Sequence, residues 1–427
     1  MNVLLLSQFY WPEERIAPTH LAVLAEELQA SGHRVTVLTG FPNHPVGQIY
    51  DGYRMKLWQW EDVRGVKVLR LPLFPDHSLS AVRRAANYTS FALSAATLGS
   101  FLTRKERPDV LFSYLPPLAL ALPVSIMRRF HDIPVVYWMT DIWPEGLLAA
   151  GVTMTSLTYR FLRTLETLVY RQATNILVNS PGFKEHLIER GVPARKLEVL
   201  VDWAEEGLFF PAQADERLAR ECSMDGMFNV VYAGNLGTAQ HLETVIGAAE
   251  LLRESKDIQF VFIGDGTDKS NLVRKVNERN LGNVIFVGRQ PLDEIHRFLA
   301  LADVLLIHLR DDPTYRMQIP SKTIAYLATG KPILCAVSGS AADLVAGAGA
   351  GVTCPPEDPQ AMATKIQLIY GKSRAERMAM GQRGRATFLS NYTRELQVAR
   401  VKAILRQASN NHRSHGVPFS DGNVHGS

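Results

Sequence analysis

The stretch "RMQIPSKTIAYLATGKPIL", residues 316–334, holds the clearest candidate for binding an anion. Its pattern predicts a short helix that begins with Pro320, Ser321, Lys322 and Thr323 and ends at a glycine. Free backbone N–H groups at a helix start bind anions, and the helix dipole is positive at that end. A lysine there adds a full positive charge, which suits a diphosphate. The plainer alternative is a capped helix with a solvated lysine.

Three further loops place glycines directly after predicted strands. They are "YAGNLGTAQHLETV" with Gly234, Asn235 and Gly237, "FIGDG" with Gly264 and Gly266, and "VGRQP" with Gly288 and Arg289. Glycine lets a backbone approach a ligand closely, although it also serves tight turns that bind nothing. Ligands of open parallel sheets lie beyond the carboxyl ends of the strands. These loops and the lysine helix start therefore favour one shared ligand site.

Two carboxylates follow another buried strand, in the segment "YWMTDIWPEGL". Asp141 and Glu145, with the indoles of Trp138 and Trp143, are predicted to face a cleft, where such groups commonly recognise sugar hydroxyls and sugar rings. An aspartate that caps a short helix would explain Asp141 equally well. A second loop predicted at this edge carries Trp11, Pro12 and Glu13.

The elements that must position these residues alternate between strands and helices. Short β-branched or leucine-rich runs separated by helical periods are typical of a parallel sheet covered on both faces. The predicted strands of the first half are 3–7, 35–39, 66–71, 110–114, 135–139 and 176–179, with helices at 18–30, 85–102, 157–170 and 181–190. Those of the second half are 229–233, 259–263, 284–287, 304–307, 332–336 and 351–353. The sequence thus predicts an α/β protein with two Rossmann-like, doubly wound parallel-sheet domains that face a cleft.

The predicted domain boundary lies within residues 202–221, which show no strand pattern. This divides the chain into a first domain, 1–205, and a second, 206–390. A helix over 391–409 follows the last strand and is expected to cross back to the first domain. Residues 410–427 are polar and rich in glycine, so we expect a disordered tail there.

The overall composition, 46% hydrophobic and 21% charged residues, is that of a well-packed soluble protein. The net charge of +4 is mild for a nucleic-acid binder, so no nucleic-acid partner is expected. Cys222, Cys335 and Cys354 are odd in number and lack metal-ligand spacing, which predicts a reduced compartment and no structural metal. The first residues read as a strand, and no apolar stretch reaches the ~20 residues of a membrane span. We therefore expect a cytoplasmic protein.

One segment points to peripheral membrane contact. Arg83 and Arg84 precede an almost wholly apolar helix, and Arg104, Lys105 and Arg107 follow it. Basic ends around such a helix predict an element, residues 83–107, that lies on an anionic membrane. The alternative is a buried core helix with charged ends.

Together, these motifs resemble those of bacterial glycosyltransferases of family 4, which have the GT-B fold. The similarity is greatest to the O-antigen and colanic-acid branch that includes the N-acetyl-fucosamine transferases. It is carried, in order along the chain to about residue 390, by "FYWPE", "TDIWPEGLLAAG", "VYAGNLGTAQHLETVI", "FIGDG", "PSKTIAYLATGKPIL" and "AGAGVTCPPEDPQAMA". By this resemblance the first domain receives the acceptor and the second holds the donor.

The resemblance implies transfer of a sugar, such as an N-acetylated deoxysugar, from a UDP-sugar with retention and without a metal. The acceptor would be a glycan or a lipid-diphosphate-linked saccharide at the inner face of the cytoplasmic membrane. Residues 234–237 with Ser321 and Lys322 would hold the diphosphate, and Gly288 and Arg289 would flank the base. The candidate catalytic residues are Lys322, Asp141 and Glu145.

The sequence also departs from the family pattern. Members commonly carry two glutamates, separated by seven residues, before the Gly-Lys-Pro strand, and Met317 and Ala325 stand at those positions. The donor's ribose and sugar must then be held by other groups. Two alternatives therefore stay open: a nucleotide-sugar epimerase of the same fold and a non-catalytic nucleotide-sugar binding protein.

Overall fold

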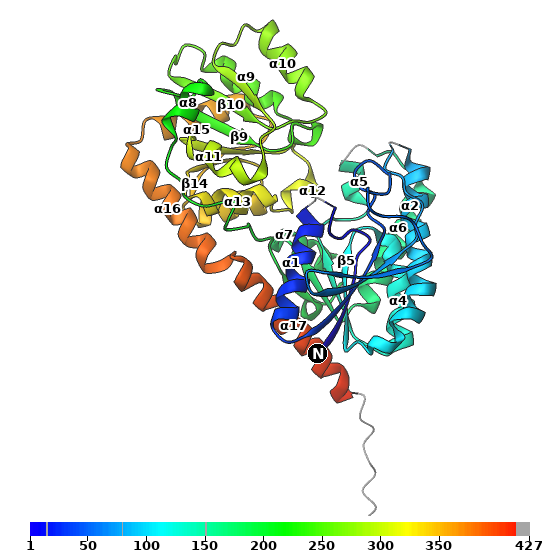
Figure 1. Ribbon diagram of the computed structural model, residues 1–427. Helices are drawn as coiled ribbons and strands as arrows, with labels where there is room; N and C mark the ends of the chain where they lie inside the picture. Colours follow the sequence, from blue (N-terminus) through cyan, green and yellow to red (C-terminus); the bar gives the residue numbers. More distant parts are fainter. Residues whose placement is uncertain (14–15, 79, 150–151, 416–427) are drawn as a thin grey trace, which may run out of the picture.

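Figure 1 shows the computed structural model of the chain, which describes residues 1–13, 16–78, 80–149 and 152–415. Two α/β units follow one another along the chain, and each is built on its own sheet. The predicted fold class is confirmed. The exact domain limits proposed above stay predictions.

The first unit has an eight-stranded sheet in the order β3-β4-β2-β1-β5-β6-β7-β8. Its neighbouring strands are parallel, except that β3 runs antiparallel to β4. The strands are β1 (Asn2–Leu6), β2 (Arg34–Gly40), β3 (Gln59–Val63), β4 (Val66–Leu71), β5 (Val110–Leu115), β6 (Val135–Met139), β7 (Asn175–Val178) and β8 (Leu197–Val199).

Helices cover both faces of this sheet because side chains alternate along each strand. In β1, Leu4 and Leu6 belong to a first core on one face of the sheet, and Val3 and Leu5 belong to a second core on the other face. The first core lies under α2 (Ala81–Ser94), the π-helical turn η1 (Ala95–Gly99), η3 (Leu118–Leu120), α4 (Ala121–His131), α6 (Ser156–Gln172) and α7 (Pro181–Glu189). The second lies under α1 (Ile16–Ala30) and the C-terminal helix α17 (Arg394–His415). Shorter elements are α3 (Ser100–Leu102), η2 (Thr103–Glu106), α5 (Glu145–Ala149) and η4 (Ala194–Lys196).

The second unit has a six-stranded, fully parallel sheet in the order β11-β10-β9-β12-β13-β14. The strands are β9 (Phe228–Ala233), β10 (Ile258–Ile263), β11 (Val284–Gly288), β12 (Val304–His308), β13 (Ile333–Ala336) and β14 (Gly351–Thr353). One face packs against α9 (Glu243–Leu251), α10 (Lys269–Glu278) and α15 (Pro359–Tyr370). The other packs against α11 (Ile295–Ala300), α13 (Ser321–Thr329), α14 (Ser340–Gly347) and α16 (Arg374–Asn391). Short elements are α8 (Glu216–Glu221), η5 (Thr238–Gln240), η6 (Leu292–Glu294) and α12 (Pro313–Arg316).

The two units meet beyond the carboxyl ends of their strands. Ser180, two residues after β7, donates a hydrogen bond from Oγ to the carbonyl of Met317, and the N–H of Gly182 donates to Ser340 Oγ at 3.1 Å. A cavity of about 580 Å³ beside these contacts is lined by residues of both units.

The last helix, α17, returns to the first unit and runs beside the N-terminus (Figure 1). Val398 and Val401 enter the core under α1, and Arg413 pairs with Asp109. The helix extends to His415, so residues 410–415 are helical where the sequence predicted a disordered tail. The rest of that tail, 416–427, lies outside the described residues.

The structure adds three elements of the first unit that the sequence pattern did not predict, namely β3, β8 and α4. Over the described ranges, no helix reaches the combined length and apolar character that crossing a membrane requires.

Candidate functional site

Three loops lie side by side at the carboxyl ends of β9, β10 and β11, and backbone hydrogen bonds join them. The N–H of Gly234 donates to the carbonyl of Ile263, and the N–H of Gly264 donates to that of Gly288, both at 2.9 Å. The N–H of Leu236 donates to the carbonyl of Asp265 at 2.9 Å. The glycines singled out in the sequence are therefore brought together.

Close packing explains why several of these positions are glycine. A Cβ atom at Gly264 would lie 1.9 Å from the carbonyl oxygen of Gly234, and one at Gly266 would lie 2.4 Å from that of Leu236. Gly234 and Gly264 also have φ values of 140° and 145°, which L-residues rarely adopt. Gly237 is buried, and its N–H donates to Gln240 Oε1 at 3.1 Å. The side chain of Asn235 donates to the same oxygen at 3.2 Å.

The start of α13 faces these loops. Ser321 is its first helical residue and Pro320 its N-cap, and no side chain caps the helix. A Cβ atom at Gly234 would lie 3.0 Å from Lys322 Nζ, so the lysine reaches the first glycine loop. Among the described residues, the buried Thr323 Oγ1 has no hydrogen-bond partner. The helix start thus places the unpartnered Lys322 Nζ beside the first glycine loop, and Thr323 follows it in the same turn.

Lys322 combines a positive charge with burial. Its Nζ atom is buried, has no hydrogen-bond partner in the described part of the chain, and lies 3.7 Å from the ring centroid of Tyr232. Burial lowers the pKa of Lys322 to about 7. A buried cation without a carboxylate costs folding free energy, and an anionic ligand would recover that cost. Apart from the ring of Tyr232, Lys322 Nζ therefore has no partner among the described residues that balances its charge.

Two residues that the sequence analysis missed hold this arrangement in place. Tyr326, one turn after Lys322, accepts from the N–H of Ala233 at 3.0 Å and donates to its carbonyl at 3.1 Å. His308 donates from Nδ1 to the carbonyl of Gln240 at 2.7 Å and accepts at Nε2 from the N–H of Glu357 at 3.3 Å. Burial lowers the pKa of His308 to about 4, so it stays neutral and acts as a fixed link between two loops.

The remaining predicted donor residues lie at the edge of the site. Gly288 ends β11 with a φ of 83°, and nothing lies within 4 Å of a Cβ placed there. Arg289 beside it is exposed. This position leaves room for a flat ring against the backbone. Arg289 has no hydrogen bond or ion pair with the described part of the chain.

The positions of the missing glutamates have a structural explanation. Met317 packs against the core of the first unit, and its carbonyl accepts the bond from Ser180. Ala325 is buried under the second sheet. At the first position an apolar contact between the two units takes the place of a carboxylate.

In the first unit, Asp141 follows β6 and is exposed. It does not cap α5, which begins four residues later. Asp202, in the segment read only as a domain boundary, lies close enough for their charges to interact. Burial, and after it the charge of Asp141, raise the pKa of Asp202 to about 6. The pKa of Tyr315 in α12 is also raised, by burial first, then by Asp312 and Asp141, so Asp141 lies near the second unit.

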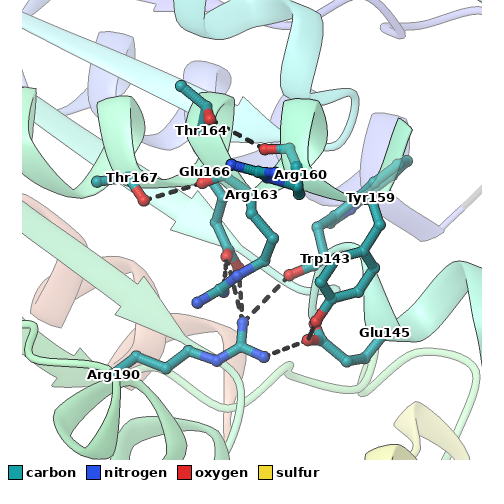
Figure 2. A network of polar contacts seen from close by, with 9 residues as sticks. All are labelled: Trp143, Glu145, Tyr159, Arg160, Arg163, Thr164, Glu166, Thr167 and Arg190. Atoms are coloured by element: carbon teal, nitrogen blue, oxygen red, sulfur yellow. Dashed lines mark hydrogen bonds and ion pairs between the residues drawn. The ribbon is translucent and has the colours of Figure 1, made fainter. Parts of the chain in front are cut away.

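Glu145 belongs to a network of ion pairs (Figure 2). Its Oε1 accepts from the guanidinium of Arg190 and, at 2.8 Å, from the hydroxyl of Tyr159. Arg190 also donates to both oxygens of the buried Glu166, and to the carbonyl of Trp143, at 3.2 Å. Burial by itself would raise the pKa of Glu145. The hydrogen bonds that Glu145 accepts, above all the one from Arg190, outweigh burial, so its pKa is lowered. This carboxylate fixes the loop that carries Asp141.

Two residues that were predicted to face the cleft, Trp138 and Glu13, are buried instead. Trp138 is 1% exposed and stacks on Trp203 at 5.8 Å, so it cannot cover a sugar ring. Trp138 belongs to β6, which is buried on both faces as the apolar run predicted, so placing its indole in a cleft was wrong. Glu13 is buried and accepts from the N–H groups of Asn43 and His44 at 2.9 Å. It therefore holds a loop and does not face a cleft.

No group of three or more His, Cys, Asp or Glu side chains gathers at a possible metal site within the described ranges. The expectation of a reaction without a metal remains a prediction.

Two consecutive α/β units, each built on a largely or fully parallel sheet, define the GT-B class of fold. Solved structures share it. Sucrose-phosphate synthase from Thermosynechococcus elongatus superposes with a TM-score of 0.75 at 18% identity, covering 96% of this chain and 99% of that one. HepE from Anabaena, in complex with UDP and glucose, gives 0.70 at 17% identity over 95% and 99% of the two chains.

Family models identify the chain more closely. A glycosyl transferase 4-like domain matches residues 17–203, and a glycosyl transferases group 1 domain matches residues 223–387. The chain therefore belongs to the glycosyltransferases that combine these two domains. WbjE of Pseudomonas aeruginosa, named as a glycosyltransferase, is 28% identical over 71% of this chain and 76% of its own length. WcaI of Escherichia coli K12, named as a colanic acid biosynthesis glycosyl transferase, is 26% identical over 77% of this chain and 82% of its own length.

Proposed function

We propose that this glycosyltransferase moves a sugar, such as an N-acetylated deoxysugar, from a UDP-sugar to a glycan or lipid-diphosphate-linked saccharide. The reaction retains the anomeric configuration, needs no metal, and serves bacterial surface polysaccharide synthesis. The name of WcaI supports the pathway class, and the UDP bound by HepE supports the donor.

The observation that carries the proposal is the unpartnered Lys322 Nζ at the start of α13, beside the Gly234 loop. A donor diphosphate placed there would accept from Lys322, from Thr323 Oγ1 and from the free N–H groups of the first helical turn. Gly288 and Arg289 would flank the base. No other described residue combines a buried cation with so many free donors.

The chemistry follows from where charge develops. The bond between the sugar C1 and the diphosphate oxygen breaks, and negative charge grows on the leaving diphosphate, where Lys322 stabilises it. The acceptor oxygen bonds to C1, and its proton passes to the leaving phosphate oxygen. No protein nucleophile is needed, and the sugar is delivered to the face that the diphosphate left.

Asp141 is the residue that we assign to the acceptor. It lies on the first unit and near the second, so its carboxylate can accept a hydrogen bond from an acceptor hydroxyl. Glu145 acts through its ion pair with Arg190, which positions the Asp141 loop. Glu145 is thus a positioning residue in this proposal.

Thermal-shift measurements with UDP-, GDP-, ADP- and dTDP-sugars test the donor. A ligand that binds only the folded protein raises its melting temperature, and we expect the largest rise with a UDP-sugar. A larger rise with a GDP-sugar would overturn the donor assignment. Formation of an epimeric sugar from the UDP-sugar alone would replace the proposed transfer by epimerisation.

Donor affinity should depend on pH through Lys322. Its pKa of about 7 leaves it charged below pH 7 and neutral above, whereas the bound diphosphate favours the charged form. Binding above pH 7 must therefore take up a proton, and affinity should fall by up to about tenfold per pH unit. Calorimetry in two buffers of different ionisation enthalpy measures that proton. Lys322→Arg, which does not titrate in this range, serves as the control, and an equal slope in both proteins would exclude Lys322 as the source.

A further inference from the structure

The helices on the outer side of the first unit carry an apolar stripe that no described residue covers. In α4, Leu122, Ile126 and Phe130 are spaced four residues apart, so they lie on one side of the helix, and each is 40–48% exposed. The opposite side of α4 contributes Val124 and Met127 to the core. The exposed stripe is thus the outer half of an amphipathic helix.

The two neighbouring helices continue this stripe. Helix α4 contacts both α2–α3 and α6, so the three lie next to one another on one face of the sheet (Figure 1). Leu93 of α2 and Phe101 of α3 are 52% and 69% exposed, and Leu157 and Phe161 of α6 are 78% and 62% exposed. Soluble monomers rarely expose so many large apolar side chains in one place.

Charge on the same helices is strongly one-sided. Residues 81–106, 121–131 and 156–172 contain nine Lys and Arg but two carboxylates, Glu106 and Glu166, for a net charge of +7. The whole chain is only +4, so the remainder is −3. Glu106 pairs with Lys67. Glu166 is buried and ion-paired, and of the nine basic residues only Arg83 and Arg163 have a carboxylate partner among the described residues. The other seven are available to an external anion.

We propose that this face, the outer sides of α2, α3, α4 and α6, docks onto a bilayer that contains anionic phospholipids. Apolar side chains enter the boundary between headgroups and acyl chains, and the basic residues around them meet the headgroups. Arg104, whose guanidinium lies 5.7 Å from the ring centroid of Phe130, shows both kinds of group side by side. A soluble protein partner would not need the complete lack of exposed carboxylates on three helices.

The proposal extends the sequence-based prediction for residues 83–107 to α4 and α6. It also deepens the proposed function, since it rests on an acceptor carried by a lipid. Helices α2, α4 and α6 begin at the carboxyl edge of the first sheet, the edge at which Asp141 lies, whereas α3 continues α2 toward the opposite edge. A lipid-linked sugar would therefore reach the acceptor site from the end of this face at which α6 begins. Basic residues are attracted to an anionic surface most strongly at low salt, so vesicle binding should weaken as the ionic strength rises.

Sedimentation with vesicles tests the proposal. The wild-type protein should bind vesicles of phosphatidylcholine with phosphatidylglycerol at least about tenfold more tightly than vesicles of phosphatidylcholine alone. The pair Arg128→Glu and Arg129→Glu should lose most of this preference. The pair Phe101→Ser and Phe161→Ser should keep a weaker binding that salt abolishes.

Matched controls lie on the second unit, where Leu251, Arg253 and Lys256 are also exposed. Leu251→Ser, and Arg253→Glu with Lys256→Glu, should bind vesicles as the wild type does. All variants should keep the donor-induced rise in melting temperature, which shows that they fold.

The outcomes separate this inference from the proposed function. If the protein binds the donor but not vesicles, only the membrane proposal is overturned. The same holds if the variants of this face and the control variants of the second unit bind vesicles equally well. So does binding to heparin without binding to vesicles, which would assign the face to a soluble polyanion. Vesicle binding without sugar transfer overturns the proposed function alone.

Discussion

Replacing Lys322 by alanine should lower sugar transfer at least about a hundredfold, the usual cost of removing one donor that stabilises developing negative charge. The fold should survive, because Lys322 Nζ makes no hydrogen bond within the described chain. The measurement is kcat and KM for a UDP-sugar with the acceptor in excess. We expect the larger loss in kcat, since charge on the diphosphate is greatest when its bond to the sugar breaks. Near-normal turnover would exclude this role.

The ligand-free protein offers a second readout of the same residue. Lys322→Met removes a desolvated charge and keeps the side-chain volume, so the free variant should be more stable at pH 6 by about 1–2 kcal/mol. The lysine's folded-state pKa of about 7 is below its ordinary value, so its cost to stability is present below pH 7 and disappears as the pH rises toward 10. The stability gain of Lys322→Met should therefore shrink in alkaline solution.

A second half-buried lysine supplies the matched control. Lys331, in the same unit, donates to the carbonyls of Ala300 and Ala302 at 2.6 and 2.9 Å, and burial lowers its pKa as well. Lys331→Met leaves both carbonyls without that donor, so it should destabilise the protein and spare kcat. If Lys322→Met and Lys331→Met change stability and kcat in the same way, burial alone accounts for the effects at Lys322, and no role in ligand binding is needed.

Most of the fold could be predicted because most of its strands are apolar and long enough to be recognised as strands in the sequence. All twelve predicted strands exist within one or two residues of their expected limits. The two that were missed lack this signal. Strand β3 reads "QWEDV", is only partly buried at the sheet edge and pairs antiparallel. Strand β8 has only three residues.

The site could be predicted only where residue type alone carries the information. The glycines after β9 and β10 and the lysine at the start of α13 were found because glycine after a strand and lysine at a helix start are local signals. Asp202, His308 and Tyr326 were missed because their roles depend on contacts across the fold, such as the pairing of Tyr326 with Ala233. Trp138 was misplaced for the same reason, since its indole is buried in the second core of the first unit, where Trp203 stacks on it.

Gly264→Ala should cause the largest loss of stability at the site. The added Cβ would lie 1.9 Å from the carbonyl oxygen of Gly234, and the φ of 145° adds strain of its own. The obstructing atom is backbone, so relief requires that the β9 and β10 loops separate. We expect a destabilisation of about 4 kcal/mol or more, measured by urea unfolding, together with loss of donor binding. Donor binding is lost because the movement displaces Gly234 from Lys322.

Two other glycines of the same unit separate the clash from the strain. Gly282→Ala meets nothing within 4 Å and has no positive φ, so it should leave stability and donor affinity unchanged. Gly288→Ala also meets nothing but has a φ of 83°, so it should cost about 1–2 kcal/mol. The expected order of unfolding midpoints is therefore Gly282→Ala, Gly288→Ala and Gly264→Ala, from highest to lowest. Equal unfolding midpoints for Gly264→Ala and Gly288→Ala would mean that the loops after β9 and β10 are not in contact. The diphosphate-binding site proposed beside Lys322 would then be wrong.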